Sequence, residues 1–233
     1  NGRSVEFDST KFLSGVPTSL PIGNTERTVF LIVDNIQLRS TQSWNIAFHY
    51  GEGGAQTKVF DIGMGFNGTE TADLVPGKLM FHGWNTEFIT DLTTQGATPY
   101  VITLDYDSTR ATGTDQMKSD LRYYIDGINY SWSSGRDPDF DLNTGDETLS
   151  VGSRENGANP FIGEILEIIV FDKVLTDDER TKLNYYLSTK WGLESTVDSD
   201  GDGFTDALEI AALSDPIDPG VIPIDLSDEV DAV

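Results

Sequence analysis

The sequence predicts an all-β protein, a two-sheet antiparallel sandwich with one C-terminal amphipathic helix and a short acidic appendage. Three observations predict this. Short apolar segments of strand length recur throughout residues 1–172, and clusters rich in Gly, Asn and Asp separate them. Only one long helical pattern is present, and it comes after these segments. Many short strands with few helices favour an antiparallel sandwich.

The predicted strands are apolar runs or alternating segments bounded by turn residues. They are 29–33, 44–50, 58–64, 78–82, 100–106, 121–125, 148–151 and 165–171. In 44–50, alternation predicts one face made by Trp44, Ile46 and Phe48, and an opposite face made by Asn45, Ala47 and His49. The dipeptide Asp126-Gly127 stands between two apolar segments, which predicts a hairpin with a type I′ turn.

The helix is predicted from its start and stop signals. Thr176 and Glu179 form a capping box, in which each side chain bonds the other residue's backbone. Gly192 supplies the C-terminal stop. Between these signals, one face carries the large apolar side chains of Leu183, Leu187 and Trp191. We expect this stripe to pack on the sandwich.

The order of these motifs resembles the laminin G-like domain of the concanavalin A-like lectin and glucanase superfamily. The motifs are the hairpin at 126–127, Val151-Gly-Ser153, Phe161-Ile-Gly-Glu-Ile165 and the helix start at 174–180. Val5-Glu-Phe-Asp8 is similar to the first strand of such domains, and 79–85 to a middle strand and loop. The resemblance implies a two-sheet jelly roll over residues 1–192.

Twelve residues near the C-terminus have the spacing of an EF-hand-type calcium loop. Gly203 is at position 6, where the chain must turn sharply, and the carbonyl of Phe204 follows at position 7. Positions 1, 3, 5, 9 and 12 carry carboxylates, namely Asp198, Asp200, Asp202, Asp206 and Glu209. A site of this kind supplies the six to eight oxygens that Ca²⁺ takes, so we expect bound Ca²⁺. The alternative is a solvated acidic linker.

The flanks of the loop differ from those of a true EF-hand. The preceding helix is predicted to end near Gly192, which leaves a spacer before position 1. Together with the following Ser214-Asp-Pro216, the loop resembles the bacterial thrombospondin type 3 repeat. That resemblance implies a calcium-stiffened linker at 193–219, with Asp215 and Asp218 as further ligands. Residues 220–233 would lead to a downstream module.

Composition excludes several classes of partner and chemistry. The formal net charge is −24, and 11 of the acidic residues follow Glu194, so the first 194 residues carry −13. This sign disfavours nucleic-acid backbones and anionic membrane surfaces. No apolar run approaches the roughly 18 residues of a membrane span, so we expect no membrane insertion. The absence of cysteine excludes disulfides and thiolate chemistry.

Candidate ligand-binding residues are aromatic and amide side chains in loop-like stretches. They are Trp84, Asn85, Tyr50, Trp132, Asn156 and Asn159. Aromatic faces and amides are what carbohydrate binding needs, although aromatic residues at strand ends also cap cores. His49 and His82 lie on separate strands without a visible partner, so we expect packed or surface residues. Glu164 and Glu167 point to opposite faces of a strand unless a bulge intervenes, which disfavours a catalytic carboxylate pair.

The sequence therefore favours a non-catalytic, calcium-dependent adhesion or carbohydrate-binding module of a secreted or cell-surface bacterial protein. Its partner would be an extracellular glycan or a cell-surface protein, beside neighbouring modules of the same polypeptide. One alternative is an accessory module that spaces or targets a larger extracellular enzyme. The other is a glycosidase or lyase that degrades polysaccharide.

Overall fold

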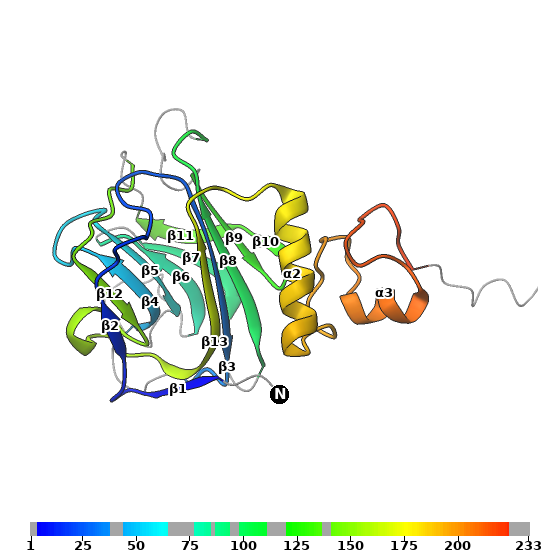
Figure 1. Cartoon of the computed structure of the whole chain (residues 1–233), viewed down its shortest axis with the longest axis horizontal. Coiled ribbons are helices and arrows are strands. Elements are labelled where there is room, and N and C mark those ends of the chain that lie inside the picture. Colours follow the sequence, from blue (N-terminus) through cyan, green and yellow to red (C-terminus); the bar gives the residue numbers. More distant parts are fainter. Residues whose placement is uncertain are drawn as a thin grey trace, which may run out of the picture.

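Two antiparallel sheets pack face to face in the computed structural model, which describes residues 4–37, 44–64, 77–84, 87–93, 98–110, 120–136 and 141–223 (Figure 1). The six-stranded sheet has the order β1 (Val5–Asp8), β13 (Ile162–Phe171), β3 (Arg27–Asp34), β8 (Tyr100–Tyr106), β9 (Leu121–Ile125) and β10 (Ile128–Tyr130). The seven-stranded sheet has the order β11 (Trp132–Arg136), β7 (Glu87–Thr93), β6 (Lys78–His82), β5 (Val59–Met64), β4 (Asn45–Gly51), β12 (Thr148–Val151) and β2 (Leu13–Gly15). The predicted all-β jelly-roll sandwich is confirmed.

The predicted strands are all present, and the Asp126-Gly127 hairpin joins β9 to β10. Both turn residues have positive φ, 52° at Asp126 and 90° at Gly127, as a type I′ turn requires. Three short or polar strands, β2, β7 and β11, were not predicted. In β7, acidic residues and threonines interrupt the apolar residues, so the segment lacks both the apolar run and the strict alternation that identified other strands.

The predicted alternation in β4 is wrong at one point. A bulge interrupts the pairing of β4 with β5 between Ile46 and Phe48. The extra residue changes the phase of the side chains, so the consecutive residues Ala47 and Phe48 both join the core. After the bulge, His49 faces outward and Tyr50 faces inward, which places a polar side chain on the outer surface of the sheet.

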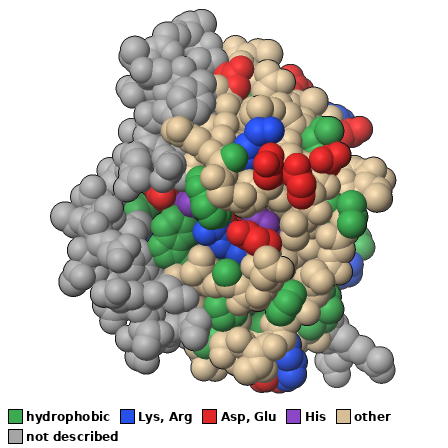
Figure 2. Space-filling model, turned by 90° about the vertical axis from the view of Figure 1, so that its left-hand side faces the viewer, with side chains coloured by type: hydrophobic (Ala, Val, Ile, Leu, Met, Phe, Trp, Pro, Cys, Tyr) green, Lys and Arg blue, Asp and Glu red, His purple; other side chains and the backbone are tan. Residues whose placement is uncertain are grey.

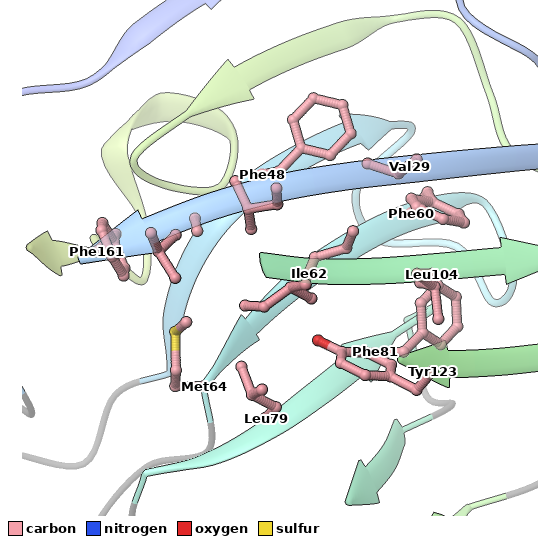
Figure 3. Packing of buried hydrophobic residues seen from close by; sticks show 14 of the residues in the cluster. Val29, Phe48, Phe60, Ile62, Met64, Leu79, Phe81, Leu104, Tyr123 and Phe161 are labelled. Atoms are coloured by element: carbon pink, nitrogen blue, oxygen red, sulfur yellow. The ribbon is translucent and has the colours of Figure 1, made fainter. Parts of the chain in front are cut away.

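The main core fills the space between the two sheets (Figure 3). Aromatic side chains dominate its centre, where Phe60 contacts Phe81 edge to face with ring centroids 5.3 Å apart. The side chains labelled in the figure come from both sheets, and they are Val29, Phe48, Phe60, Ile62, Met64, Leu79, Phe81, Leu104, Tyr123 and Phe161. Most polar residues of the same strands face outward, whereas the guanidinium of Arg27 is buried against the rings of Tyr50, Phe60 and Tyr106.

Helix α2 (Asp177–Trp191) covers the outer face of the six-stranded sheet (Figure 1). Its capping box at Thr176 and Glu179 is formed, and Gly192 ends it in the left-handed region with φ 72°. The predicted apolar stripe is confirmed: Leu187 is fully buried in a second core, and Leu183 and Trp191 pack against it. That core continues beyond the helix, and its members are Phe30, Ile32, Val101, Leu175, Leu187, Leu193 and Val197.

The acidic loop and the short helix α3 (Asp206–Ala212) follow α2 (Figure 1). Leu193 and Val197, which immediately precede the loop, are buried against β3 and β8 residues. The loop therefore starts from a segment that is packed on the sandwich. Of the expected downstream linker, residues 224–233 lie outside the described residues.

Candidate functional site

A row of polar residues crosses the outer face of the seven-stranded sheet. Ser150 of β12 is opposite His49 of β4, and the register continues through Asp61 of β5 and His82 of β6 to Glu87 of β7. Directly opposed residues share a face of the sheet, so their side chains are neighbours. Figure 2 looks onto this face, where the two histidines, in purple, lie among acidic, basic and hydrophobic side chains.

Asp61 is the centre of this polar row and is fully buried. Its Oδ1 lies 2.5 Å from Nδ1 of His49, and its Oδ2 lies 2.9 Å from Nδ1 of His82. The Nε atom of Arg154 is 3.1 Å from the same Oδ2. One carboxylate therefore has two imidazoles and a guanidinium around it.

The far side of each imidazole faces a second carboxylate. Nε2 of His49 is 3.2 Å from Oε2 of Glu155, and Nε2 of His82 is 3.8 Å from Oε1 of Glu87. The buried Nε2 of His49 and Oε2 of Glu155 have no aligned hydrogen bond despite this distance. In each histidine, Nδ1 therefore faces Asp61 and Nε2 faces a second carboxylate on the side of the ring away from Asp61.

Burial and the neighbouring charges set the protonation of the row. Burial opposes ionisation of Asp61, but His49 and then His82 hold the pKa of that carboxyl well below its usual range. Burial also lowers the pKa of His82 below its ordinary 6.5, and this effect outweighs the attraction of Asp61. At pH 7 the row therefore has an ionised Asp61 and a neutral His82.

Two tryptophans and Arg154 border the row. The guanidinium carbon of Arg154 is 4.4 Å from the ring centroid of Trp84 and 5.7 Å from that of Trp44. The rings of Trp44 and His82 also pack edge to face, with their centroids 4.2 Å apart. Both tryptophans are half-buried, and Trp84 has a φ of 61° at the end of β6. The cation–π contact with Arg154 thus helps to hold Trp84 over the row, and it offsets part of the cost of the positive φ.

Two other residues predicted from the sequence to bind a ligand are used in packing. Tyr50 is fully buried, and Nη1 of Arg27 donates to its hydroxyl at 2.7 Å, so it cannot present a ring to a ligand. Trp132 packs on Phe88 and Tyr123 as a cap of the core. These two expectations are corrected, because both rings are used in packing.

The two asparagines lie in the segment that follows Arg154. Asn156 is exposed in the 3₁₀ turn η1 (Glu155–Gly157), next to Glu155 of the row. Asn159 is half-buried, and its carbonyl accepts a hydrogen bond from the N–H of Ile46. Asn85 lies outside the described residues.

Sequence reasoning missed most of the row. His49 and His82 were expected to be packed or surface residues without a partner; both are packed, but the expected lack of a partner is wrong, because both contact Asp61. A signal was available: His49 and Asp61 are single polar residues between large apolar or aromatic neighbours on a strand, and His82 follows the apolar run 79–81. Such a residue must face away from the core, so several on adjacent strands meet.

Glu164 and Glu167 do not form a carboxylate pair. A bulge in β13 does occur between Ile165 and Glu167. Nevertheless the hydroxyl of Ser4 donates to Glu164, whereas Lys190 and Trp191 donate to Glu167. Each carboxylate has its own local partners, as expected for edge or surface residues.

The acidic loop brings three of its carboxylates together. One ligand-type oxygen from each of Asp198, Asp200 and Asp202 lies within 4.8 Å of the others. The backbone is turned by hydrogen bonds to the same side chains, because the amides of Gly201 and Gly203 both donate to Asp198. The first half of the predicted loop therefore converges on one point.

Several oxygens of this group lack a partner. Oδ2 of Asp200, Oδ2 of Asp202 and Oε2 of Glu209 are buried without a hydrogen bond. Burial, and then the charges of Asp200 and Asp202, raise the pKa of Glu209 to about 7. Burial raises the pKa of Asp200 to about 6. Clustered acceptors without donors fit a hard divalent cation.

The remaining predicted ligands have other partners. Both oxygens of Asp206 accept hydrogen bonds from Ser199, at 2.9 Å from its N and 2.9 Å from its Oγ. Asp215 and Asp218 are exposed and accept from the amides of Ile217 and Gly220. The N–H of Phe204 donates to Asp202, which fixes the residue expected to offer its carbonyl.

Comparison with known proteins identifies the fold but no family. No family model matches the chain, and no curated protein matches it. Among solved structures, a proposed carbohydrate-binding protein from Bacteroides ovatus has a TM-score of 0.53 and 16% identity. The match covers 75% of this chain and 44% of that one, so this chain spans less than half of its relative.

A second similar structure is the binding domain of botulinum neurotoxin serotype G. Its TM-score is 0.51 at 9% identity, over 80% of this chain and 42% of that one. At such identities the likeness establishes the jelly-roll fold alone. Within the described residues, no helix is long and apolar enough to cross a membrane.

Proposed function

We propose that the chain is a non-catalytic carbohydrate-binding module whose ligand lies on the outer face of the seven-stranded sheet. The observation that carries the proposal is the polar row centred on Asp61, with Trp44 and Trp84 beside it. Buried, mutually hydrogen-bonded polar residues on a sheet surface add little to stability compared with apolar packing. A binding role gives a reason for so many on one face.

The chemistry of the row suits a sugar. A sugar ring has apolar C–H faces and hydroxyl edges, so it needs an aromatic surface beside fixed hydrogen-bonding groups. Trp84 supplies a half-buried aromatic ring. Glu87 is at one end of the row and Glu155 lies beside His49, and the oxygens of both can accept from hydroxyls. Because Asp61 anchors the histidines and Arg154, these groups are held in position before a ligand arrives.

The comparisons support this proposal in one respect. The Bacteroides ovatus protein, which has the same fold, is described as a proposed carbohydrate-binding protein. Carbohydrate binding by this chain is our inference from its own outer sheet face.

We further propose that Ca²⁺ binds the acidic loop through Asp198, Asp200, Asp202 and Glu209. The ion would neutralise the clustered carboxylates and hold 198–218 in a compact form, as in a thrombospondin type 3 repeat after a laminin G-like domain. Calcium-rich surroundings imply a secreted or cell-surface protein. Its partners would be an extracellular glycan or cell-surface protein in adhesion, and neighbouring modules of the same polypeptide.

One observation favours a second candidate function, acid–base catalysis on a glycan. Each histidine of the row lies between two carboxylates, an arrangement that can hold and move a proton. A glycosidase or lyase would use this property, whereas a binding module would use only the hydrogen bonds. The third candidate, a spacer or targeting module of a larger enzyme, needs no ligand on this face.

The test is a glycan array followed by titration calorimetry on the best ligand, with analysis of the glycan afterwards. We expect binding without turnover, and roughly tenfold weaker binding by Trp84→Ala. Tyr186→Ala is the matched control, because Tyr186 is 54% exposed on α2, away from this sheet. Cleaved glycan would favour the enzyme, and no binding at all would favour the spacer. Unchanged binding by Trp84→Ala would show that the ligand binds at another part of the molecule.

A further inference from the structure

The acidic loop lies directly against the β9–β10 turn of the sandwich. The N–H of Asp198, the first residue of the loop, donates to the carbonyl of Asp126 at 3.0 Å. Gly127 is closer still: a Cβ added there would stand 1.7 Å from the carbonyl oxygen of Asp198 and 2.7 Å from its carbon. The turn and the loop are thus in backbone-to-backbone contact, and only glycine fits at position 127.

The turn cannot easily withdraw from this contact. The amide of Asp126 donates to the carbonyl of Val101, and the amide of Val101 donates back to Oδ1 of Asp126, both at 2.8 Å. The turn is therefore fixed to the end of β8 as well as by its own strands. Val101 also belongs to the second core under α2.

The loop is held from its other side. Val197 is fully buried in the second core, and its carbonyl accepts the amide of Asp206. Asp206 in turn bonds Ser199 through both carboxylate oxygens. A shift of Asp198 away from the turn would disturb these bonds and the group of Asp198, Asp200 and Asp202.

We infer that the Asp126-Gly127 turn positions the calcium loop, so that calcium affinity and the stability of the β9–β10 hairpin are linked. The inference rests on the proposed calcium site. Linkage is reciprocal: if the turn holds the loop in its binding geometry, then bound calcium must stabilise the turn by the same free energy. Gly127 is a positioning residue, since none of its atoms is a ligand.

The first test compares Ca²⁺ titrations of the full chain and two glycine variants. Gly127→Ala and Gly54→Ala both place a side chain on backbone with a φ of 90°, which disfavours residues other than glycine. A Cβ at Gly54 meets only a Trp84 ring carbon at 3.9 Å, away from the loop. We expect roughly tenfold weaker Ca²⁺ binding by Gly127→Ala, a typical coupling between residues in contact, and unchanged binding by Gly54→Ala.

The outcomes separate the two proposals. Equal affinity of all three proteins would overturn the inference and leave the calcium site standing. A wild-type chain that does not bind Ca²⁺ would overturn both. If Gly127→Ala does not fold, the second test decides.

That second test measures amide hydrogen exchange of the wild-type chain with Ca²⁺ and with EDTA. We expect Ca²⁺ to slow exchange in 198–209 and also in 121–130, but not in the β6–β7 strands of the other sheet. Slowing confined to 198–209 would overturn the inference, because the hairpin would then not respond to the ion.

Discussion

Replacing Asp61 with Asn tests whether the polar row is held by charge. The substitution keeps the shape of the side chain but removes the anion that His49, His82 and Arg154 surround. Arg154 is only 8% exposed, so its charge would remain buried without its nearest carboxylate. Removing one partner of a buried ion pair costs about 3–5 kcal/mol, because the other charge stays uncompensated.

A second buried aspartate provides the matched control. Asp105 is also fully buried, but its nearest arginine atoms are 3.8 and 4.0 Å away, and burial raises its pKa. Its one aligned side-chain bond, from Thr28, can be kept by an amide oxygen. Because the ionised form of Asp105 is disfavoured, we expect Asp105→Asn to change the free energy of unfolding by less than about 1 kcal/mol.

The assay is denaturant unfolding at pH 7 with saturating Ca²⁺, followed by tryptophan fluorescence. A loss of about 3–5 kcal/mol is a large part of the roughly 5–15 kcal/mol by which domains are stable, so the midpoint should move clearly. If Asp61→Asn and Asp105→Asn cost the same, the row is a set of neutral hydrogen bonds and the ionic interpretation is refuted.

Three further outcomes are expected. Unfolded His82 takes up a proton near pH 6.5 and the folded form only at lower pH, so this residue by itself lowers the free energy of unfolding as the pH drops from 7 to 5, and in pH-dependent denaturation His82→Gln should keep more of its pH 7 stability at pH 5 than the wild-type chain does. Asp202→Ala with Glu209→Ala should abolish Ca²⁺ binding in calorimetry while the circular dichroism of the sandwich is retained; loss of the β signal would contradict this. Tyr50→Phe should cost about 1–3 kcal/mol in denaturant unfolding, because it leaves a buried N–H of Arg27 without an acceptor, and a smaller loss would show that the group finds another partner.

Local patterns were sufficient to predict much of this chain. The capping box at Thr176 and the Asp126-Gly127 turn depend only on residues a few positions apart, and both formed as expected. Strands with long apolar runs were found for the same reason. Strands such as β7 were missed, because this segment has no clear local strand pattern and is held as a strand by its pairing with β6 and β11.

Short-range periods and motifs were enough to predict the antiparallel sandwich, the helix and the spacing of the acidic loop. The folded arrangement of the strands brings His49, Asp61 and His82 together, because they lie on three strands whose register no local pattern fixes. The tertiary structure also brings Gly127 into contact with Asp198, more than 70 residues further along the chain. Such pairings depend on how the sheets and α2 pack, which is a property of the whole fold.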